Sequence, residues 1–350
     1  MTCGETEHAC GKVRENMNIY DVAKLAGVSI ATVSRVVNGS SRVSEKTKEK
    51  VLAIIEQSDY TPNVFARGLG LDSMKTIGIM CPDIADEYMA HAVSCMEHRL
   101  QKYEYDCILY CSGFQQKDKE KSASLLLAKR IDALILVGST YAGSGLPEDD
   151  TEYIRNAAKQ VPVFLINGKT SGDNIYCGFC DDRQSTYDVT SELIKTGRKR
   201  ILFLSDSHSY SATKKLEGYE AALRDAGYPV LGELKFYTKN NIHYVRDMLL
   251  ERKDLNFDSV VATDDGMAVG ALKYAAAKRL SVPHDMCVVG YNNSALSISC
   301  EPELTTVDNQ VEKICNKTVD KMIQLLQGET SQEAEYAVPG KLVKRCTTDF

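Results

Sequence analysis

Short hydroxyl side chains and one arginine are grouped within residues 29–38 of this 350-residue chain. Serine and threonine hydroxyls bind phosphate oxygens near the start of a helix, and arginine binds a phosphate or the edge of a guanine base. Small apolar side chains can contact the methyl group of thymine. The candidate DNA-binding residues here are Ser29, Ile30, Ala31, Thr32, Ser34, Arg35 and Asn38. Together these residue types predict a surface that binds duplex DNA.

A helix must hold these side chains in one row, and the pattern of residues 18–59 predicts three short helices. Asn18 and Asp21 form a capping signal for the first helix, and Ser29 can cap the second. The apolar residues Val22, Ala23, Leu25 and Ala26 follow the first cap, Val33, Val36 and Val37 give the second helix a narrow apolar face, and the third helix is expected to turn Val51, Leu52, Ile54 and Ile55 inward. Two short helices joined at Gly27 are typical of a helix-turn-helix unit, whose second helix enters the major groove. A plain helical hairpin is the alternative, but it would not require a face rich in hydroxyl groups.

The chain beyond residue 75 alternates between apolar runs and stretches of helical period. The predicted strands are 76–81, 105–111, 132–138, 161–167, 200–205, 258–263 and 286–291, and the predicted helices are 87–102, 116–130, 183–197, 213–227 and 265–280. This alternation is typical of a doubly wound parallel sheet, and the length favours two α/β lobes. Ligands of such sheets bind beyond the carboxyl ends of the strands.

The formal net charge of −6 would by itself argue against a nucleic-acid partner, because DNA affinity depends on Lys and Arg. The charge is unevenly distributed, however. Seven basic and five acidic side chains give residues 17–70 a charge of +2, whereas residues 71–350 carry −7. The front of the chain therefore remains compatible with DNA, and the acidic remainder suggests a second role.

The twelve cysteines are scattered, and most lie in apolar runs, which is typical of reduced cysteines in the cytoplasm. Cys177 and Cys180 have the spacing of a redox pair, which stays an open alternative. They lack the further ligands that a zinc site needs. We expect no metal and no cofactor.

No apolar run is long enough for a signal peptide or a membrane span, so a cytoplasmic protein is expected. Residues 1–16 show no periodicity and are expected to be a disordered tail, or a stretch that precedes a true start at Met17. Gly168, Lys169 and Thr170 resemble the end of a phosphate-binding loop. Val163 stands where that motif requires glycine, so a nucleotide site is not predicted.

Residues 18–80 resemble the DNA-binding head of the lactose-repressor (LacI/GalR) family of bacterial transcription regulators. The matching stretches are IYDVAKLAGVSIATVSRVVNG, VSEKTKEKVLAIIEQSDYTPNVFARGL and KTIGIM. The resemblance continues, less specifically, in the order of strands and helices to about Arg345. It implies an all-α helix-turn-helix head followed by an α/β, two-lobed effector domain like a periplasmic binding protein. The implied parts are 17–62 for the head, 63–75 for a hinge helix and linker, 76–177 with 307–335 for the first lobe, and 178–304 with 336–350 for the second.

The resemblance also gives the linker a role. A helix of about eight residues is too short to be stable alone in water, so residues 63–70 are expected to fold only conditionally. In the family, two such hinge helices pair in the minor groove. By resemblance, Leu69 is the leucine wedge that unstacks a central base step, and Arg67 and Asn63 lie near the phosphates or the groove floor.

The effector residues implied by the resemblance follow the ends of strands. They are Asp83, Tyr88, Asn167, Lys215, Asp265 and Asn292. Acidic, amide and cationic side chains suit a polyhydroxy ligand, and Tyr88 could stack on a sugar ring. Asn167 and Asn292 replace an aspartate found in many members, and Lys215 replaces an arginine. These departures leave the identity of the ligand open.

The resemblance therefore implies a homodimeric repressor that binds a pseudo-palindromic DNA operator and responds to a small molecule, expected to be a carbohydrate. No membrane partner is expected. Two alternatives from other classes remain. One is a solute-binding module without a role on DNA, which residues 18–70 argue against. The other is an α/β enzyme, for which the sequence shows no catalytic constellation.

Overall fold

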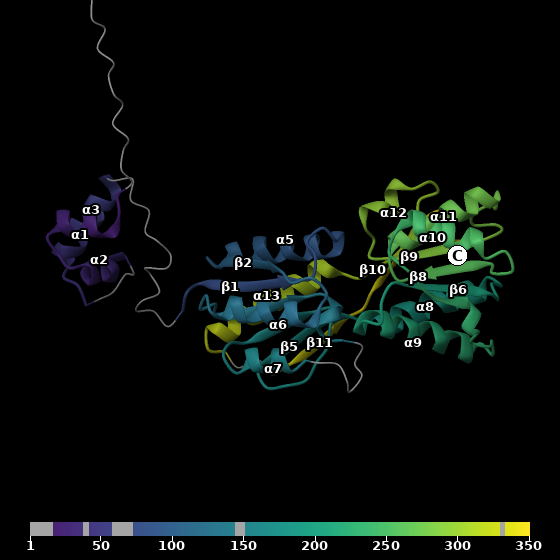
Figure 1. Cartoon of the computed structure of the whole chain (residues 1–350), viewed down its shortest axis with the longest axis horizontal. Helices are drawn as coiled ribbons and strands as arrows, with labels where there is room; N and C mark the ends of the chain where they lie inside the picture. The colour runs from purple at the N-terminus through teal and green to yellow at the C-terminus, as the bar shows by residue number, and fades with distance from the viewer. Residues whose placement is uncertain (1–16, 38–41, 58–72, 144–150, 330–332) are drawn as a thin grey trace, which may run out of the picture. The chain divides into compact units, whose positions relative to one another are not determined.

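The computed structural model of the chain describes residues 17–37, 42–57, 73–143, 151–329 and 333–350 (Figure 1). These residues form two compact units that divide between Met74 and Lys75. We call the first unit the head and the second the body. The body contains two α/β lobes, each built on one sheet.

The head contains α1 (Ile19–Ala26), α2 (Ile30–Val37) and α3 (Glu45–Gln57). The Asn18 side chain accepts hydrogen bonds from the backbone N–H groups of Tyr20 and Asp21, and the Asp21 carboxylate accepts one from the N–H of Asn18. This reciprocal capping box begins α1. Gly27 ends it with φ of 65°, and Ser29 caps α2 by accepting from the N–H of Thr32 at 3.2 Å. The predicted helix-turn-helix unit is confirmed.

A small apolar core holds the three helices together. Its buried members are Val22, Ala23, Ala26, Val33, Val36 and Val51. Leu52 was expected to face inward but is 46% exposed, and Leu25 of α1 is 57% exposed. Each lies about a quarter turn from the buried row of its helix, so the prediction for Leu52 was wrong.

Gly27 offers a test of the turn between α1 and α2. A Cβ at this position would meet no atom closer than the Lys50 Nζ at 3.9 Å, so only the left-handed backbone opposes a side chain. Gly27→Ala should therefore cost the head about 1 kcal/mol, and Gly27→Asn less, because asparagine tolerates this conformation. Calorimetry of the full chain should show the head transition lowered by about 4–8 °C in the alanine variant. An equal loss in both variants would contradict this explanation.

The first lobe is a parallel sheet in the order β11-β5-β4-β3-β1-β2. Its strands are β1 (Thr76–Cys81), β2 (Asp106–Cys111), β3 (Ala133–Val137), β4 (Val163–Ile166), β5 (Ile175–Cys180) and β11 (Glu335–Val338). Helices α5 (Glu87–Gln101) and α13 (Val311–Leu326) cover one face, and α6 (Gln116–Leu127) and α7 (Glu152–Ala158) cover the other (Figure 1).

The second lobe repeats this architecture in the order β12-β10-β9-β8-β6-β7, with β12 antiparallel. Its strands are β6 (Ile201–Ser205), β7 (Lys235–Tyr237), β8 (Ser259–Ala262), β9 (Cys287–Tyr291), β10 (Thr305–Asp308) and β12 (Lys341–Val343). The helices are α8 (Asp182–Lys195) and α9 (Tyr210–Asp225) on one face, and α10 (Ile242–Glu251), α11 (Asp265–Lys278) and the short α12 (Ala295–Ser299) on the other side (Figure 1).

The chain passes between the lobes three times, at slightly different places from those expected. Strand β5 stays in the first sheet to Cys180, whereas the expected boundary was 177. Strand β10 pairs with β9 in the second sheet, although a return to the first lobe was expected at 307. Strand β11 remains in the first sheet to Val338. These strands continue across the expected boundaries because their neighbours supply hydrogen-bonding partners that the sequence does not reveal.

The long βα units are close to their predicted positions, but several strands were missed. Strand β1 coincides with the predicted 76–81, whereas β5, β7, β10, β11 and β12 were not predicted. Cys177 and Cys180 lie on β5, where a spacing of three places them on opposite faces of the sheet. The alternative of a redox pair is therefore contradicted. The cysteines of the described ranges are all free thiols.

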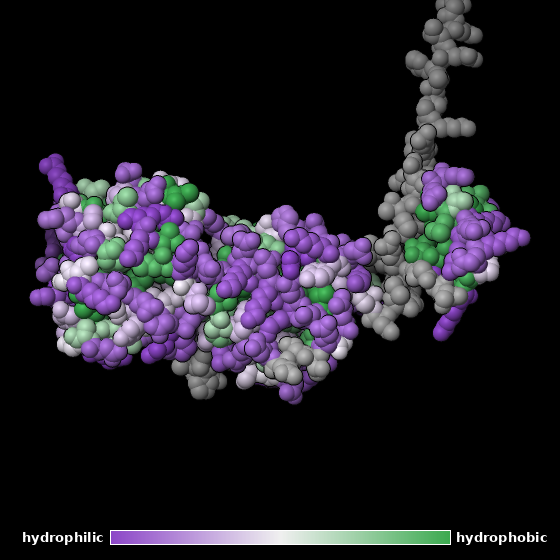
Figure 2. All heavy atoms as spheres, turned by 180° about the vertical axis from the view of Figure 1, so that it is seen from behind, coloured by the Kyte–Doolittle hydropathy of each residue, from purple (hydrophilic) through white to green (hydrophobic). Residues whose placement is uncertain are grey.

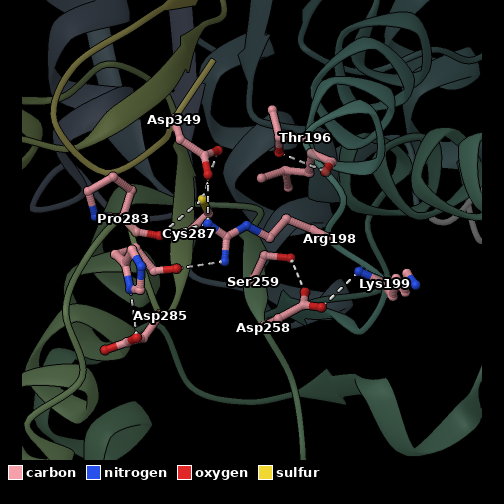
Figure 3. Close-up of polar contacts among 11 residues, drawn as sticks. Thr196, Arg198, Lys199, Asp258, Ser259, Pro283, Asp285, Cys287 and Asp349 are labelled. Atoms are coloured by element: carbon pink, nitrogen blue, oxygen red, sulfur yellow. Dashed lines mark hydrogen bonds and ion pairs between the residues drawn. The ribbon is translucent and has the colours of Figure 1, made fainter.

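The C-terminal segment is fixed to the second lobe at the end of the sheet where β8 and β9 begin (Figure 3). The Arg198 guanidinium donates to the Asp349 carboxylate at 2.7 Å and to the carbonyl of Pro283 at 2.8 Å. The Cys287 thiol donates to the same carboxylate. The last residues of the chain are thus an integral part of this lobe.

The visible face of the body is mostly hydrophilic, with scattered hydrophobic areas (Figure 2). In the part of the chain that the structure describes, no helix is both long enough and apolar enough to cross a membrane.

Candidate DNA-binding face and effector cleft

The candidate DNA-binding residues of α2 form one exposed row. Ile30, Ala31 and Arg35 are exposed and Ser34 is half-buried. Positions i, i+1, i+4 and i+5 share a helix face, and Val33 and Val36 occupy the opposite one. The Ser29 and Thr32 hydroxyls hydrogen-bond each other at 2.9 Å at the start of α2. The helix therefore presents the side chains that the sequence selected, with its first turn fixed by the cap.

The remaining candidates for DNA contact lie outside the described residues. These are Asn38, Asn63, Arg67 and Leu69. Their proposed contacts with the minor groove and phosphates stay predictions from the sequence.

A cleft runs between the two lobes of the body. It comprises a cavity of about 830 Å³ and a second of about 450 Å³, which share Asp86, Tyr88, Phe114 and residues of the second lobe. Two hydrogen bonds between described residues join its walls. The Ser139 hydroxyl donates to the hydroxyl of Ser209 at 2.9 Å, and the N–H of Ala295 donates to the Glu87 carboxylate at 2.7 Å. The lobes are thus in direct contact around a hollow of ligand size.

The cleft is built from the carboxyl ends of strands, where α/β sheets bind their ligands. In the first lobe these ends supply Asp86 after β1, Phe114 after β2, Thr140 after β3 and Asn167 after β4. In the second lobe they supply Asp206 after β6, Asn240 after β7, Thr263 and Asp264 after β8, and Asn292 after β9. The sheet geometry therefore brings together side chains that are far apart in sequence.

Three carboxyl groups from both lobes line both cavities. Burial, followed by the charges of Asp206 and Asp83, raises the pKa of Asp86, although hydrogen bonds from the Met89 and Tyr88 backbone oppose this. Burial also raises the pKa of Asp264 to about 6, and the charges of Asp265 and Asp206 contribute to the increase. The cleft is therefore an acidic environment in which carboxylates raise one another's pKa.

Five of the six predicted effector residues line the cleft. Asp83 lines the larger cavity, Asn167 and Lys215 the smaller, and Tyr88 and Asn292 both. The Asn292 amide donates to the Asp264 carboxylate at 2.8 Å. A role for these five in effector binding stays a proposal.

Asp265 does not line the cleft, so the expectation for this residue is corrected. Its side chain is 1% exposed and accepts hydrogen bonds from the Thr306 hydroxyl and from the N–H and hydroxyl of Ser294. The preceding residue, Asp264, is the N-cap of α11 and faces the cavity instead. The two successive aspartates point in different directions because the chain turns from strand to helix between them.

The expected stacking role of Tyr88 is also not supported. Its ring packs against the core of the first lobe. Phe114, which is 59% exposed and lines both cavities, is the aromatic side chain that stands free at the cleft.

Three hydroxyl groups at the smaller cavity are buried without a hydrogen-bond partner among the described residues. They belong to Tyr88, Thr140 and Thr263. An unsatisfied buried hydroxyl costs about 1–3 kcal/mol. Such groups are expected where a ligand supplies the missing partner.

A buried polar cluster lies behind the cleft, where the chain enters the second lobe. The Asp182 carboxylate, 3% exposed, accepts hydrogen bonds from the Ser211 and Tyr291 hydroxyls, both at 2.6 Å. The Lys215 ammonium lies 3.7 Å from the centre of the Tyr291 ring and donates to the carbonyl of Thr263. Lys215 therefore lines the cleft and also stabilises its wall through Thr263 and Tyr291.

The sequence reasoning missed several lining residues. Among them are Asp86, Phe114, Asp206, Asn240, Thr263 and Asp264. Asp206 and Asp264 follow directly after predicted strands, so their position in the sequence could have predicted that they line the cleft. Asn240 follows the short strand β7, which no apolar run indicates.

Models of known protein families match two parts of the chain. Residues 18–63 match the model for bacterial regulatory proteins of the lacI family, and residues 190–348 match a periplasmic binding protein-like domain. An HTH-type transcriptional regulator of Lachnoclostridium phytofermentans is 46% identical over 95% of this chain and 100% of its own length. Catabolite control protein A of Priestia megaterium is 32% identical over 95% of this chain and 99% of its own.

Solved structures show the same architecture. The Lac repressor dimer bound to operator and the anti-inducer ONPF has a TM-score of 0.82 and 27% identity, over 95% of this chain and 99% of that one. The complex of the transcriptional regulator CelR with cellobiose has a TM-score of 0.68 and 25% identity, over 95% and 100%. The helix-turn-helix head, the two α/β lobes and these relatives agree: the chain belongs to the lacI family of bacterial regulatory proteins and is a DNA-binding transcriptional regulator.

Proposed function

We propose that the protein represses transcription as a homodimer and that a carbohydrate bound in the cleft controls its affinity for a pseudo-palindromic operator. The observation that carries the control mechanism is the cleft itself. Polar strand ends of both lobes face one hollow, and three buried hydroxyls there have no partner within the described residues. A ligand with several hydroxyl groups could satisfy both walls at once.

Ligand binding between lobes can be coupled to DNA binding through the geometry of the body. A ligand that contacts both walls favours one lobe arrangement by its difference in affinity for the two arrangements. The chain crosses between the lobes after β5, after β10 and after β11. A change in lobe angle would therefore be transmitted through three connections to the position of the first lobe, from which the linker leads to the head.

Dimerisation is proposed from the charge of the head. A surplus of +2 over residues 17–70 gives one head few phosphate contacts, so a single subunit should bind DNA weakly. Two linked heads convert the second binding event into an intramolecular one. The solved Lac repressor relative is a dimer on its operator.

The two alternatives are less well supported. A solute-binding module would not require the exposed row of α2. The relatives named above are transcriptional regulators, and we propose binding rather than catalysis as the activity. A DNA target places the working protein in the cytoplasm.

Selection from randomised palindromic duplexes with the full chain, followed by a mobility-shift titration, tests this function. We expect one palindrome to be enriched, a shift that weakens with salt, and a change in affinity when a carbohydrate stabilises the protein against heat. Absence of any enriched sequence would refute the role on DNA. Unchanged operator affinity with every stabilising carbohydrate would refute the control mechanism.

Thr263→Val tests whether the cleft is built around a ligand. The substitution replaces the unpartnered hydroxyl with a methyl group, so we expect the free energy of unfolding of the ligand-free protein to rise by about 1 kcal/mol. Affinity for a carbohydrate effector should fall in the same variant. Urea unfolding and calorimetric titration measure the two effects.

Thr190→Val is the matched control, because the Thr190 hydroxyl is buried and donates to the carbonyl of Thr186 at 2.8 Å. This variant should lose about 1 kcal/mol of stability. Loss of stability in both variants would contradict the interpretation of Thr263.

A further inference from the structure

The cleft contains more negative than positive charge. Five carboxyl groups line it, from Asp83, Asp86, Glu87, Asp206 and Asp264, against three ammonium groups from Lys215, Lys239 and Lys273. Asp86 belongs to the first lobe, and Asp206 and Asp264 belong to the second. These three line both cavities, so like charges face one another across the space between the lobes.

One of these carboxylates has no hydrogen-bond donor among the described residues. Asp83 accepts from the N–H of Ala85, and Asp86 accepts from that of Met89. Asp264 accepts from Gly266 and from the Asn292 amide. Asp206 has no hydrogen bond or ion pair within the ranges that the structure describes. It is nevertheless close enough to raise the pKa of both Asp86 and Asp264.

Lys215 and Lys239 do not neutralise this charge by pairing with the carboxylates. Lys215 is 6% exposed and is held by the Thr263 carbonyl and the Tyr291 ring. The Lys239 ammonium lies 5.4 Å from the centre of the Tyr244 ring. Among the described residues, neither lysine forms an ion pair with a carboxylate in the cleft.

A second observation indicates what the ligand carries besides charge. Thr263 is 5% exposed, lines the smaller cavity beside Asp264, and has a hydroxyl without a partner in the described parts of the chain. The unpartnered hydroxyls of Tyr88 and Thr140 lie at the same cavity. The site therefore combines a surplus of carboxylate with hydroxyl groups that need polar partners.

We propose that the effector is a carbohydrate that carries a protonated amine. The ammonium donates to Asp206 and Asp86 across the cleft, and the ring hydroxyls bind the unpartnered hydroxyls and Asn167. A cation between the two walls relieves the repulsion that opposes their approach, whereas a sugar phosphate increases it. This inference rests on the proposed function, since it names the class of ligand for the same cleft.

The experiment compares matched sugars with the full-length protein at pH 7 and low ionic strength. Glucosamine, galactosamine and mannosamine are titrated beside glucose, galactose and mannose, with glucose 6-phosphate as the anionic member. We expect at least one amino sugar to bind about tenfold more tightly than its neutral counterpart, and the phosphate to bind most weakly. Added salt should reduce this preference, because it screens the ammonium–carboxylate attraction.

Asp206→Asn removes the charge that lacks a partner, so the ratio of the amino-sugar affinity to the neutral-sugar affinity should fall to within about twofold. Asp173→Asn is the control, since Asp173 is exposed in the first lobe and does not line the cleft. It should leave the preference unchanged. Melting temperatures of both variants show that each remains folded.

Three outcomes would overturn the inference: no binding of any amino sugar, equal binding of amino and neutral sugars, or tighter binding of the phosphate. A preference that persists in Asp206→Asn would overturn it as well. The operator titration is run in parallel without sugar. Retained operator binding separates a wrong ligand class from a failure of the proposed function.

Discussion

Asp182→Ala is expected to lower the free energy of unfolding of the body by about 3–5 kcal/mol. The substitution leaves the Ser211 and Tyr291 hydroxyls without their shared acceptor in a buried site. The Tyr291 ring that loses this acceptor also packs against the buried Lys215 ammonium, at 3.7 Å from the ring centre. Removal of one partner from a buried, hydrogen-bonded charge network has a cost of this size. Urea unfolding of the full chain measures the change.

Two further variants make this result interpretable. Asp182→Asn keeps one acceptor and should lose less than the alanine variant. Asp188→Ala removes an exposed carboxylate from the same helix, where it accepts only from Gln184, and should change stability by less than about 0.5 kcal/mol. A loss below about 1 kcal/mol in Asp182→Ala would show that the cluster does not support the lobe junction.

Arg35→Ala is expected to weaken operator binding by about 1–3 kcal/mol, and to relax the preference for one base pair in each half-site. Arg35 is exposed on α2, in the row opposite the buried Val33 and Val36, so its guanidinium is free to reach a base edge. Fluorescence anisotropy with the selected operator, and with variants substituted at each position, measures both the loss and its dependence on sequence.

Lys24→Ala provides the matched control for charge. It removes one positive charge from the exposed surface of α1 and leaves the row on α2 intact. We expect any loss in this variant to be similar for all DNA sequences and to reduce the salt dependence. If Arg35→Ala gave the same uniform loss, Arg35 would be a phosphate contact and not a determinant of specificity.

The helices of the head and seven of the strands were predictable because their signals are local, whereas the inner strands β5 and β10 were missed. Asn18, Gly27 and Ser29 determine the ends of the head helices through caps and a left-handed turn, which depend on neighbours a few residues away. Strand β1 is similarly local, since it is an unbroken apolar run. Strands β11 and β12 have burial patterns of mixed exposure, and their place depends on β5 and β10, which are remote in sequence. No local pattern could have revealed them.

The cleft was predictable in position but not in detail. Strand ends indicated Asn167 and Asn292 correctly as lining residues, because parallel strands bring their carboxyl ends to one edge. Which of Asp264 and Asp265 lines the cleft depends on the angle at which α11 leaves β8. The sequence does not show this angle, because the two adjacent residues are identical. The unpartnered hydroxyl of Thr263 is a property of the packed structure, since the residue type alone does not show whether a buried hydroxyl finds a partner.

The threading of the chain through the lobes has a consequence for its synthesis on the ribosome. The head helices are contiguous from Ile19 to Gln57 and can fold early in translation. The first sheet lacks its edge strand β11 until Val338 has been synthesised. The second sheet needs Thr347, because the Thr347 carbonyl accepts a hydrogen bond from the N–H of Val288 and its hydroxyl accepts one from the N–H of Thr305. Both lobes therefore complete their sheets only after residues 335–347 have been synthesised. A nascent polypeptide acquires its DNA-binding head long before the domain that regulates it, and a stop codon before Val338 leaves that head without a complete regulator.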